Sequence, residues 1–419
     1  MKSKNIIAML TTLGAVAVIS AIFGGFYVSD NVSSDNLTTV NDNNDYSVNE
    51  PILERDDFVF AFYSEITKEN EKSNIFFSPF GISTAFSIAY EGAEGNTASE
   101  MLQVFGFESD DKKRQEKISD ALSRLNHKDD WYKLQVANAL WIKDEYKIKQ
   151  DYIDTVQTHY SGTVENVDFV TDDGIDRINQ WVKDKTNDKI EKILEPDSTD
   201  ELTLMVITNA VYFKGKWSSQ FSPEKTTDKP FWTDKNNSVM IPMMSEPADV
   251  YNYAETDYFQ ALELNYLGRD ISMVVLLPKD RDGIKSLEQS INKDKFDSIK
   301  NSMTRQPLTV QMPKFEFETE YDLIKPLQSL GLHDAFDEND ANFQGITNEQ
   351  VYLAQAKHKA FVNVNEEGTE AAAITGLVFE FTSGPPEPVA EFIADHPFMF
   401  IIQEKETGEI LFIGRLVSP

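Results

Sequence analysis

The side chains best suited to acid–base or metal chemistry near neutral pH are the five histidines of this sequence. None lies in a His-Glu-x-x-His pattern, and the chain has neither a Gly-x-Ser-x-Gly nucleophile elbow nor a Gly-x-x-x-x-Gly-Lys phosphate loop. The acidic run 337–348 resembles a calcium loop but lacks glycine at its sixth position and glutamate at its twelfth. Cysteine is absent, which excludes disulfides and thiol chemistry. The sequence therefore predicts no metal site, no cofactor and no enzyme activity.

The segment 366–383 is the most unusual stretch of the chain. Read with a period of two from Thr369, one side is small and uncharged and then increasingly apolar, while the other side carries the charge. The uncharged side consists of Thr369, Ala371, Ala373, Thr375, Leu377 and Phe379. Gly368 precedes this pattern, and the loop signal Gly384-Pro385-Pro386 follows it. The pattern indicates a loop that can become a strand, although Glu-Ala-Ala-Ala also favours an ordinary helix beside a turn.

Helices are expected mainly in the first half of the chain. Apolar residues at helical spacing predict an amphipathic helix over 54–71. Ser78 before Pro79 predicts the N-cap of a second, apolar helix. Thr97 and Glu100 predict a capping box at the start of a third.

Strands are expected mainly in the second half, as alternating or continuously apolar runs. The predicted strands are 134–142, 202–213, 271–277, 308–317, 351–364, 398–402 and 410–413. No internal repeat and no second linker interrupts the chain from Pro51 to Pro419. The sequence therefore predicts one α+β domain over 51–419.

The charge of the chain is strongly unbalanced, with 70 Asp and Glu against 39 Lys and Arg and a formal net charge of -31. Such an acidic protein repels nucleic acid, anionic lipid and polyanions, so neither nucleic acid nor a polyanionic activator is expected as a partner. With 41% hydrophobic residues, the chain can still bury a large core.

The N-terminus has the composition of a targeting segment. Lys2 and Lys4 precede the uncharged run 6–28, which predicts either a cleaved signal peptide or a retained membrane anchor within 1–28. In both cases the rest of the chain is expected outside the cytoplasm, either secreted or anchored to the outer face of the membrane. The stretch 29–50 is rich in Asn, Asp and Ser and is expected to be a disordered acidic spacer.

Several short stretches, in the same order along the chain, resemble the serpins, a family of serine protease inhibitors. These stretches are Asn74-Ile-Phe-Phe-Ser-Pro79, Asn209-Ala-Val-Tyr-Phe-Lys-Gly-Lys-Trp217, Val239-Met-Ile-Pro-Met-Met244, Met312-Pro-Lys-Phe315, His358-Lys-Ala360, Asn365-Glu-Glu-Gly-Thr-Glu-Ala-Ala-Ala373, Ala394-Asp-His-Pro-Phe398 and Gly414-Arg-Leu-Val-Ser-Pro419. Together they cover essentially the whole of 51–419.

The resemblance implies an α+β fold of three β-sheets and about nine helices, with an exposed reactive-centre loop at about 366–391. It also implies a metastable monomer that inhibits by suicide-substrate trapping. A serine protease cleaves the loop and is held as a covalent acyl-enzyme while the loop inserts as a new strand, a recognised case of strand addition.

Residue by residue, the resemblance implies a hinge and a reactive bond in this loop. The hinge is Glu366, Glu367, Gly368, Thr369, Glu370, Ala371, Ala372 and Ala373, whose small residues are typical of inhibitory members. The usual spacing from hinge to bond puts the cut between Thr382 and Ser383, which favours elastase- or subtilisin-like proteases. The stretch before Phe398 is a few residues longer than in familiar members, so Phe381 or Phe379 is an alternative recognised residue that favours chymotrypsin-like proteases.

The resemblance also assigns a polar cluster and a contact point for the loop. Ser78, Asn209 and His358 match the cluster beneath the opening sheet, and Trp217 matches the point where the loop meets that sheet. Gly81 stands where many members carry a second serine, so hydrogen bonding in the cluster is expected to differ. An alternative function is a non-inhibitory carrier or binding protein with the same fold.

Overall fold

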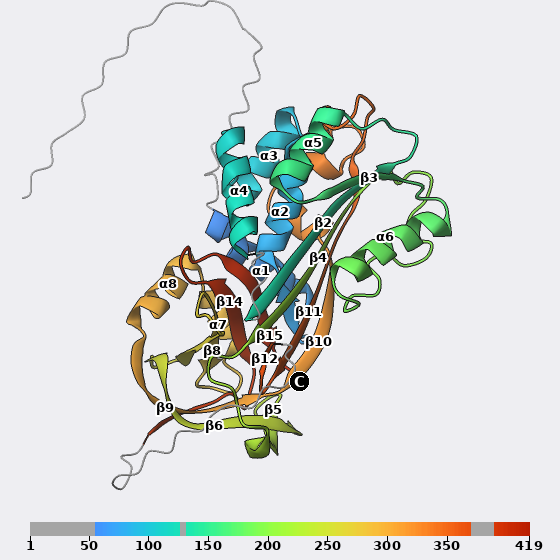
Figure 1. Ribbon diagram of the computed structural model, residues 1–419. Helices are drawn as coiled ribbons and strands as arrows, with labels where there is room; N and C mark the ends of the chain where they lie inside the picture. Colours follow the sequence, from blue (N-terminus) through green and yellow to red (C-terminus); the bar gives the residue numbers. More distant parts are fainter. Residues whose placement is uncertain (1–54, 126–130, 370–388) are drawn as a thin grey trace, which may run out of the picture. The chain divides into compact units, whose positions relative to one another are not determined.

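Nine α-helices and fifteen β-strands make up the described part of the chain in this computed structural model (Figure 1). The structure describes residues 55–125, 131–369 and 389–419. The predicted targeting segment 1–28, the spacer 29–50 and the loop residues from Glu370 to Ser383 lie outside these ranges. None of the described helices is long and apolar enough to cross a membrane.

The helices lie mostly in the first half of the chain, as the sequence predicts. They are α1 (Arg55–Glu69), α2 (Pro79–Tyr90), α3 (Gly95–Phe105), α4 (Asp111–Leu125), α5 (Gln150–His159), α6 (Asp172–Lys185), α7 (Ile284–Ser290), α8 (Lys293–Ser302) and α9 (Ile324–Ser329). The Ser78 side chain accepts from the Gly81 N–H and so caps α2, which confirms the predicted N-cap.

A six-stranded sheet runs through the middle of Figure 1 and has the order β10-β11-β12-β4-β2-β3. Its strands are β2 (Tyr132–Lys143), β3 (Thr163–Val167), β4 (Met205–Lys216), β10 (Phe315–Asp322), β11 (Leu353–Asn365) and β12 (Gly368–Thr369). β4 is buried along almost its whole length, as its continuously apolar sequence predicts.

Each face of this sheet belongs to a different core because side chains alternate along a strand. Leu140 of β2 and Ile207 of β4 join the main core, on the face that α2 contacts. The intervening Trp141 and Val206 join a second core with apolar residues of α6. The sheet is thus covered by helices on both faces, which fixes the direction in which every strand residue points.

The other described strands form a nine-stranded sheet with the order β1-β15-β14-β8-β7-β6-β9-β13, and β5 also pairs with β6. They are β1 (Ile75–Phe77), β5 (Thr227–Trp232), β6 (Ser238–Glu255), β7 (Phe259–Asn265), β8 (Ile271–Pro278), β9 (Thr304–Pro313), β13 (Ala390–Ile393), β14 (Phe398–Glu404) and β15 (Ile410–Leu416). The expected three sheets are therefore linked into two hydrogen-bonded networks, because β6 pairs first with β5 and later with β7. The α+β class is confirmed.

Two local predictions were wrong. The single strand predicted over 308–317 is divided at Lys314, where β9 ends and β10 begins in the other sheet. The predicted capping box does not form, because α3 already begins at Gly95. Instead, the Thr97 hydroxyl accepts from the Asn342 N–H at 3.0 Å, and the Glu100 carboxylate accepts from the backbone N–H groups of residues 333 and 334. Both side chains therefore hold a distant loop.

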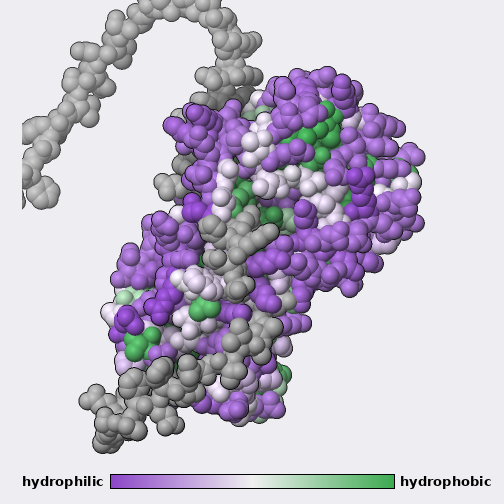
Figure 2. Space-filling model, in the orientation of Figure 1, coloured by the Kyte–Doolittle hydropathy of each residue, from purple (hydrophilic) through white to green (hydrophobic). Residues whose placement is uncertain are grey.

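Hydrophilic residues cover most of the face shown in Figure 2, and hydrophobic residues appear there only as small separate areas.

Candidate site for strand insertion

The two central strands of the six-stranded sheet diverge at one end. β11 and β4 pair in parallel from Leu353↔Met205 to Phe361↔Tyr212. Beyond this point β12 lies between them, antiparallel to both, with Thr369 opposite Val364 on one side and Gly215 on the other. The beginning of the predicted hinge therefore already occupies the sheet as a short additional strand.

Gly368 is the residue that allows this close approach. Its φ is 154°, and a Cβ at this position would lie 1.9 Å from the Gly215 carbonyl oxygen and 2.7 Å from the Lys216 Cα. Both neighbouring atoms belong to backbone, which cannot move aside without breaking the sheet. Only glycine fits here.

Thr369 is buried behind Gly368, with 1% of its surface exposed. Its hydroxyl shares a hydrogen bond of 2.7 Å with the hydroxyl of Tyr266. The ring of Tyr266 in turn stacks on Trp217, with ring centroids 4.5 Å apart. A small hydroxyl side chain thus fits this position, and a long charged one does not.

Trp217 holds the residues that lead into the hinge. Its indole N–H donates to the Asn365 carbonyl at 3.0 Å, and its backbone N–H donates to the Glu367 carbonyl at 2.8 Å. The structure therefore places Trp217 against the start of the predicted hinge.

Glu366 anchors the first residue of the hinge. Its carboxylate forms an ion pair of 2.8 Å with Lys314 and accepts a hydrogen bond of 2.7 Å from the Thr226 hydroxyl. Its backbone carbonyl accepts from the Phe221 N–H at 2.9 Å. Burial by itself raises the pKa of Glu366, but the bonds from Lys314 and Thr226 outweigh it, so the pKa is lowered and the carboxylate stays charged at neutral pH.

The predicted polar cluster lies farther along the same two strands. His358 and Asn209 are register partners across the β11–β4 pairing. The Ser78 N–H donates to His358 Nε2 at 3.1 Å, and His358 Nδ1 lies 2.5 Å from Asn209 Oδ1. Asn209 donates in turn to Asn138 of β2. This chain of hydrogen bonds crosses three strands, and β4 cannot separate from β11 unless the link between His358 and Asn209 breaks.

His358 takes part in this chain as a neutral ring. Burial lowers its pKa from 6.5 to about 3, and an interaction with the Asn209 backbone opposes this only in part. Because Nε2 accepts from the Ser78 N–H, the proton of the neutral ring is on Nδ1 and is donated to Asn209.

Gly81 leaves room for the Asn209 side chain. A Cβ at position 81 would lie 2.6 Å from Val211 Cγ2 and 2.9 Å from the Asn209 amide atoms. The Gly81 N–H donates to the Ser78 hydroxyl, which donates to the Leu411 carbonyl at 2.7 Å. A serine in place of Gly81 would therefore displace Asn209 in this protein.

The structure thus brings together two groups of predicted site residues. Glu367 bonds to Trp217, Thr369 is linked to Trp217 through Tyr266, and Ser78, Asn209 and His358 contact one another. The rest of the predicted hinge (Glu370, Ala371, Ala372 and Ala373) and the residues around the predicted bond (Phe379, Phe381, Thr382 and Ser383) lie outside the described residues. Sequence reasoning did not identify Tyr266, Lys314 or Asn138, because their roles depend on pairings between strands that are distant in the chain.

A comparison with family models defines the class of protein to which this fold and site belong. The model described as Serpin (serine protease inhibitor) matches residues 54–419. The chain belongs to the serpin family, and its α+β architecture is the serpin fold.

Individual proteins support the same conclusion. The chain is 39% identical over 376 residues to a serpin-like protein of Methanosarcina acetivorans, with 86% of each chain covered. It is 37% identical over 376 residues to the leukocyte elastase inhibitor of Bos taurus, covering 86% of this chain and 97% of that protein. The crystal structure of uncleaved ovalbumin matches with a TM-score of 0.79 at 30% identity, covering 87% of this chain and 98% of the ovalbumin chain.

Proposed function

We propose that this protein inhibits serine proteases by suicide-substrate trapping, and that it is not itself an enzyme. A protease cleaves the loop, remains attached as an acyl-enzyme, and is trapped when the loop inserts between β4 and β11. One observation carries the proposal: Gly368 and Thr369 already pair with both of these strands at the point where they diverge. An antiparallel strand that continues from Thr369 enters the sheet there by replacing the parallel β4–β11 pairing.

The register of this insertion follows from the observed pairs. Thr369 lies opposite Gly215, so each later loop residue lies opposite a residue one position earlier in β4, and Phe379 reaches Met205, where β4 begins. By the same count along β11, Thr375 arrives between Asn209 and His358. A threonine hydroxyl both donates and accepts, so it can replace the hydrogen bond that opening of the sheet breaks.

The alternating sequence of the loop suits this register. Thr369 faces Tyr266 and the main core. Ala371, Ala373, Leu377 and Phe379 have the same parity, so on insertion the uncharged side of the segment is buried in that core. Glu370 and Glu380 point to the opposite face. A strand with this pattern enters the sheet without burying a charge in the main core.

The proposed partner is an extracytoplasmic serine protease of the elastase, subtilisin or chymotrypsin type, met by a secreted or membrane-anchored monomer. The relative named leukocyte elastase inhibitor supports the first of these types. Cleavage between Thr382 and Ser383 fits elastase- or subtilisin-like enzymes, and cleavage after Phe381 fits chymotrypsin-like ones.

The test is to mix the purified protein with one protease of each type and to look for a complex that survives SDS. Mass spectrometry of the released C-terminal peptide locates the cut in the same experiment. A stable complex with a peptide that begins at Ser383 supports both mechanism and bond, and a peptide that begins at Thr382 moves recognition to Phe381. Clean cleavage without a complex contradicts inhibition and leaves the carrier function.

A further inference from the structure

A pocket of about 240 Å³ lies behind Trp217, which forms part of its lining. Its lining includes Trp217, Val250, Asn252, Arg269, Arg305 and Lys405. Arg269 comes from the turn between β7 and β8, Arg305 from β9, and Lys405 from the residues that follow β14. Three separate parts of the chain thus direct a cationic residue to one cavity.

The charges around this pocket are not balanced. In the described ranges, no carboxylate forms an ion pair with the guanidinium of Arg269 or of Arg305, whereas Lys405 pairs with Glu263 at 3.0 Å. The one acidic residue in the lining, Asp249, accepts hydrogen bonds from the Ser219 hydroxyl and from its neighbour's N–H. Two unpaired arginines in one cavity are unexpected in a chain whose formal net charge is -31.

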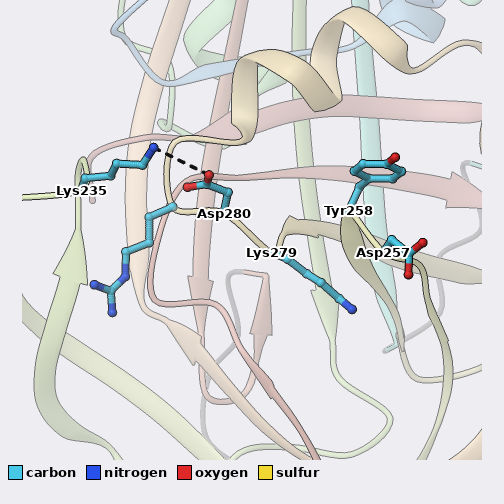
Figure 3. Close-up of a pocket in the computed structure, with 6 residues that line it drawn as sticks. Lys235, Asp257, Tyr258, Lys279 and Asp280 are labelled. Atoms are coloured by element: carbon cyan, nitrogen blue, oxygen red, sulfur yellow. Dashed lines mark ion pairs between the residues drawn. The ribbon is translucent and has the colours of Figure 1, made fainter.

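A second pocket on the same protein provides a contrast (Figure 3). Its cations already have partners: Lys235 lies 3.1 Å from Asp282, and Lys279 lies 2.7 Å from Glu255. Arg281 stacks over the ring of Trp232 at 3.9 Å. The pocket in Figure 3 is therefore a network of surface ion pairs, whereas the pocket behind Trp217 retains guanidinium groups free to bind an external anion.

We propose that the pocket behind Trp217 binds a small organic anion whose carboxylate or phosphate group lies between Arg269 and Arg305. A guanidinium presents a planar pair of N–H donors that matches either oxyanion. Val250, which is 46% exposed, supplies apolar surface for the body of the ligand. This inference concerns binding alone and does not depend on the proposed inhibitory function.

The site is connected to the hinge through two short links. The indole N–H of Trp217 donates to the carbonyl of Asn365, and its backbone N–H donates to the carbonyl of Glu367. The backbone N–H of Arg269 donates to the carbonyl of Tyr266, whose hydroxyl bonds to Thr369. An anion bound to the Arg269 guanidinium restrains the turn that bonds to Tyr266, and we expect it to stabilise the docked position of Thr369.

The test is isothermal titration of the purified protein with citrate and, separately, with inorganic phosphate, in sodium chloride of matched ionic strength. We expect saturable 1:1 binding of at least one of them, with a dissociation constant below about 1 mM. Arg269→Ser and Arg305→Ser should each weaken binding by about tenfold or more, because each removes a charge-assisted hydrogen bond. Preference for citrate identifies a carboxylate ligand, and preference for phosphate identifies a phosphorylated one.

Arg281→Ser is the matched control, because it removes one positive charge from the pocket in Figure 3. It should leave the dissociation constant unchanged. Both arginines of the proposed site are exposed, so their variants should unfold at the same temperature as the parent protein. The proposal is overturned if neither anion saturates the protein by about 10 mM, or if Arg281→Ser weakens binding as much as Arg269→Ser does.

Discussion

Reversing the charge of Glu366 should destabilise the protein and weaken inhibition together. The Glu366 carboxylate bonds to Lys314 at 2.8 Å and to the Thr226 hydroxyl at 2.7 Å. The Lys314 side chain is 39% exposed, so solvent screens the ion pair, and its contribution is about 1 kcal/mol. The hydroxyl bond adds about 1 kcal/mol. Glu366→Lys removes both and brings two ammonium groups together, for a total loss of about 2–3 kcal/mol.

The assay is denaturant unfolding followed by tryptophan fluorescence, combined with the stoichiometry of protease inhibition. Lys314→Glu alone should also destabilise, whereas the swapped pair Glu366→Lys with Lys314→Glu should recover about 1 kcal/mol. Inhibition by Glu366→Lys should need more inhibitor per protease, because the hinge is no longer held at the point where β4 and β11 diverge. Glu255→Lys is the matched control: it breaks the exposed pair with Lys279 and should cost less than about 1 kcal/mol.

The pH dependence gives the same pair a second test. The pKa of Glu366 is lowered below 4.5 in the folded protein. Its stabilising contribution is therefore fully present above pH 4.5 and is lost as the pH falls through the folded pKa.

Two results of the charge-reversal experiment would refute this account of the anchor. One is a coupling energy between Glu366→Lys and Lys314→Glu below about 0.3 kcal/mol, and the other is a Glu366→Lys protein as stable as the parent.

Three further predictions concern the hinge and the cluster. Thr369→Arg should still be cleaved but should lose inhibition, because it forces an unpaired charge against Tyr266; unchanged stoichiometry would show that Thr369 is not part of the hinge. Gly368→Ala should displace the hinge, since its Cβ would lie 1.9 Å from the Gly215 oxygen, and backbone hydrogen exchange at Gly215 should rise. The free energy of unfolding should fall as the pH drops from 6.5 toward 3, and His358 should contribute at most about 1.4 kcal/mol per pH unit to this fall. The reason is that His358 takes up a proton in the unfolded chain, whereas the buried ring, with a pKa of about 3, stays neutral in the folded protein. Unfolding curves of His358→Gln measured over this range should lack that part of the slope.

The strands that form the site were predictable because their apolar patterns are strong. β4 and β11 were located to within a few residues by continuous or alternating hydrophobic runs. The single strand predicted over 308–317 was wrong because alternating apolar residues occur on both sides of Lys314, the residue at which the chain passes from one sheet to the other.

The partners of the hinge were not predictable from local pattern. Glu366 meets Lys314, and Thr369 meets Tyr266, only because β12 lies between two strands whose register is set by the whole sheet. Thr97 and Glu100 looked like a helix cap for the same reason: the local pattern was correct for a cap, but a loop distant in the sequence takes both side chains. Local chemistry thus indicates which residues are polar and special, and the fold decides what they contact.

Insertion in register is the central claim, and the absence of cysteine from the chain allows a direct measurement of it. Ile374 should lie opposite Ala210 after cleavage, because Thr369 lies opposite Gly215 before it. Directly opposed strand residues are close enough for a disulfide. A protein with Ile374→Cys and Ala210→Cys should therefore crosslink under mild oxidation only after the protease has cut the loop, and the off-register pair of Ile374→Cys with Thr208→Cys should not. Crosslinking before cleavage, equal crosslinking of the two pairs, or none in either would contradict insertion between β4 and β11 in this register.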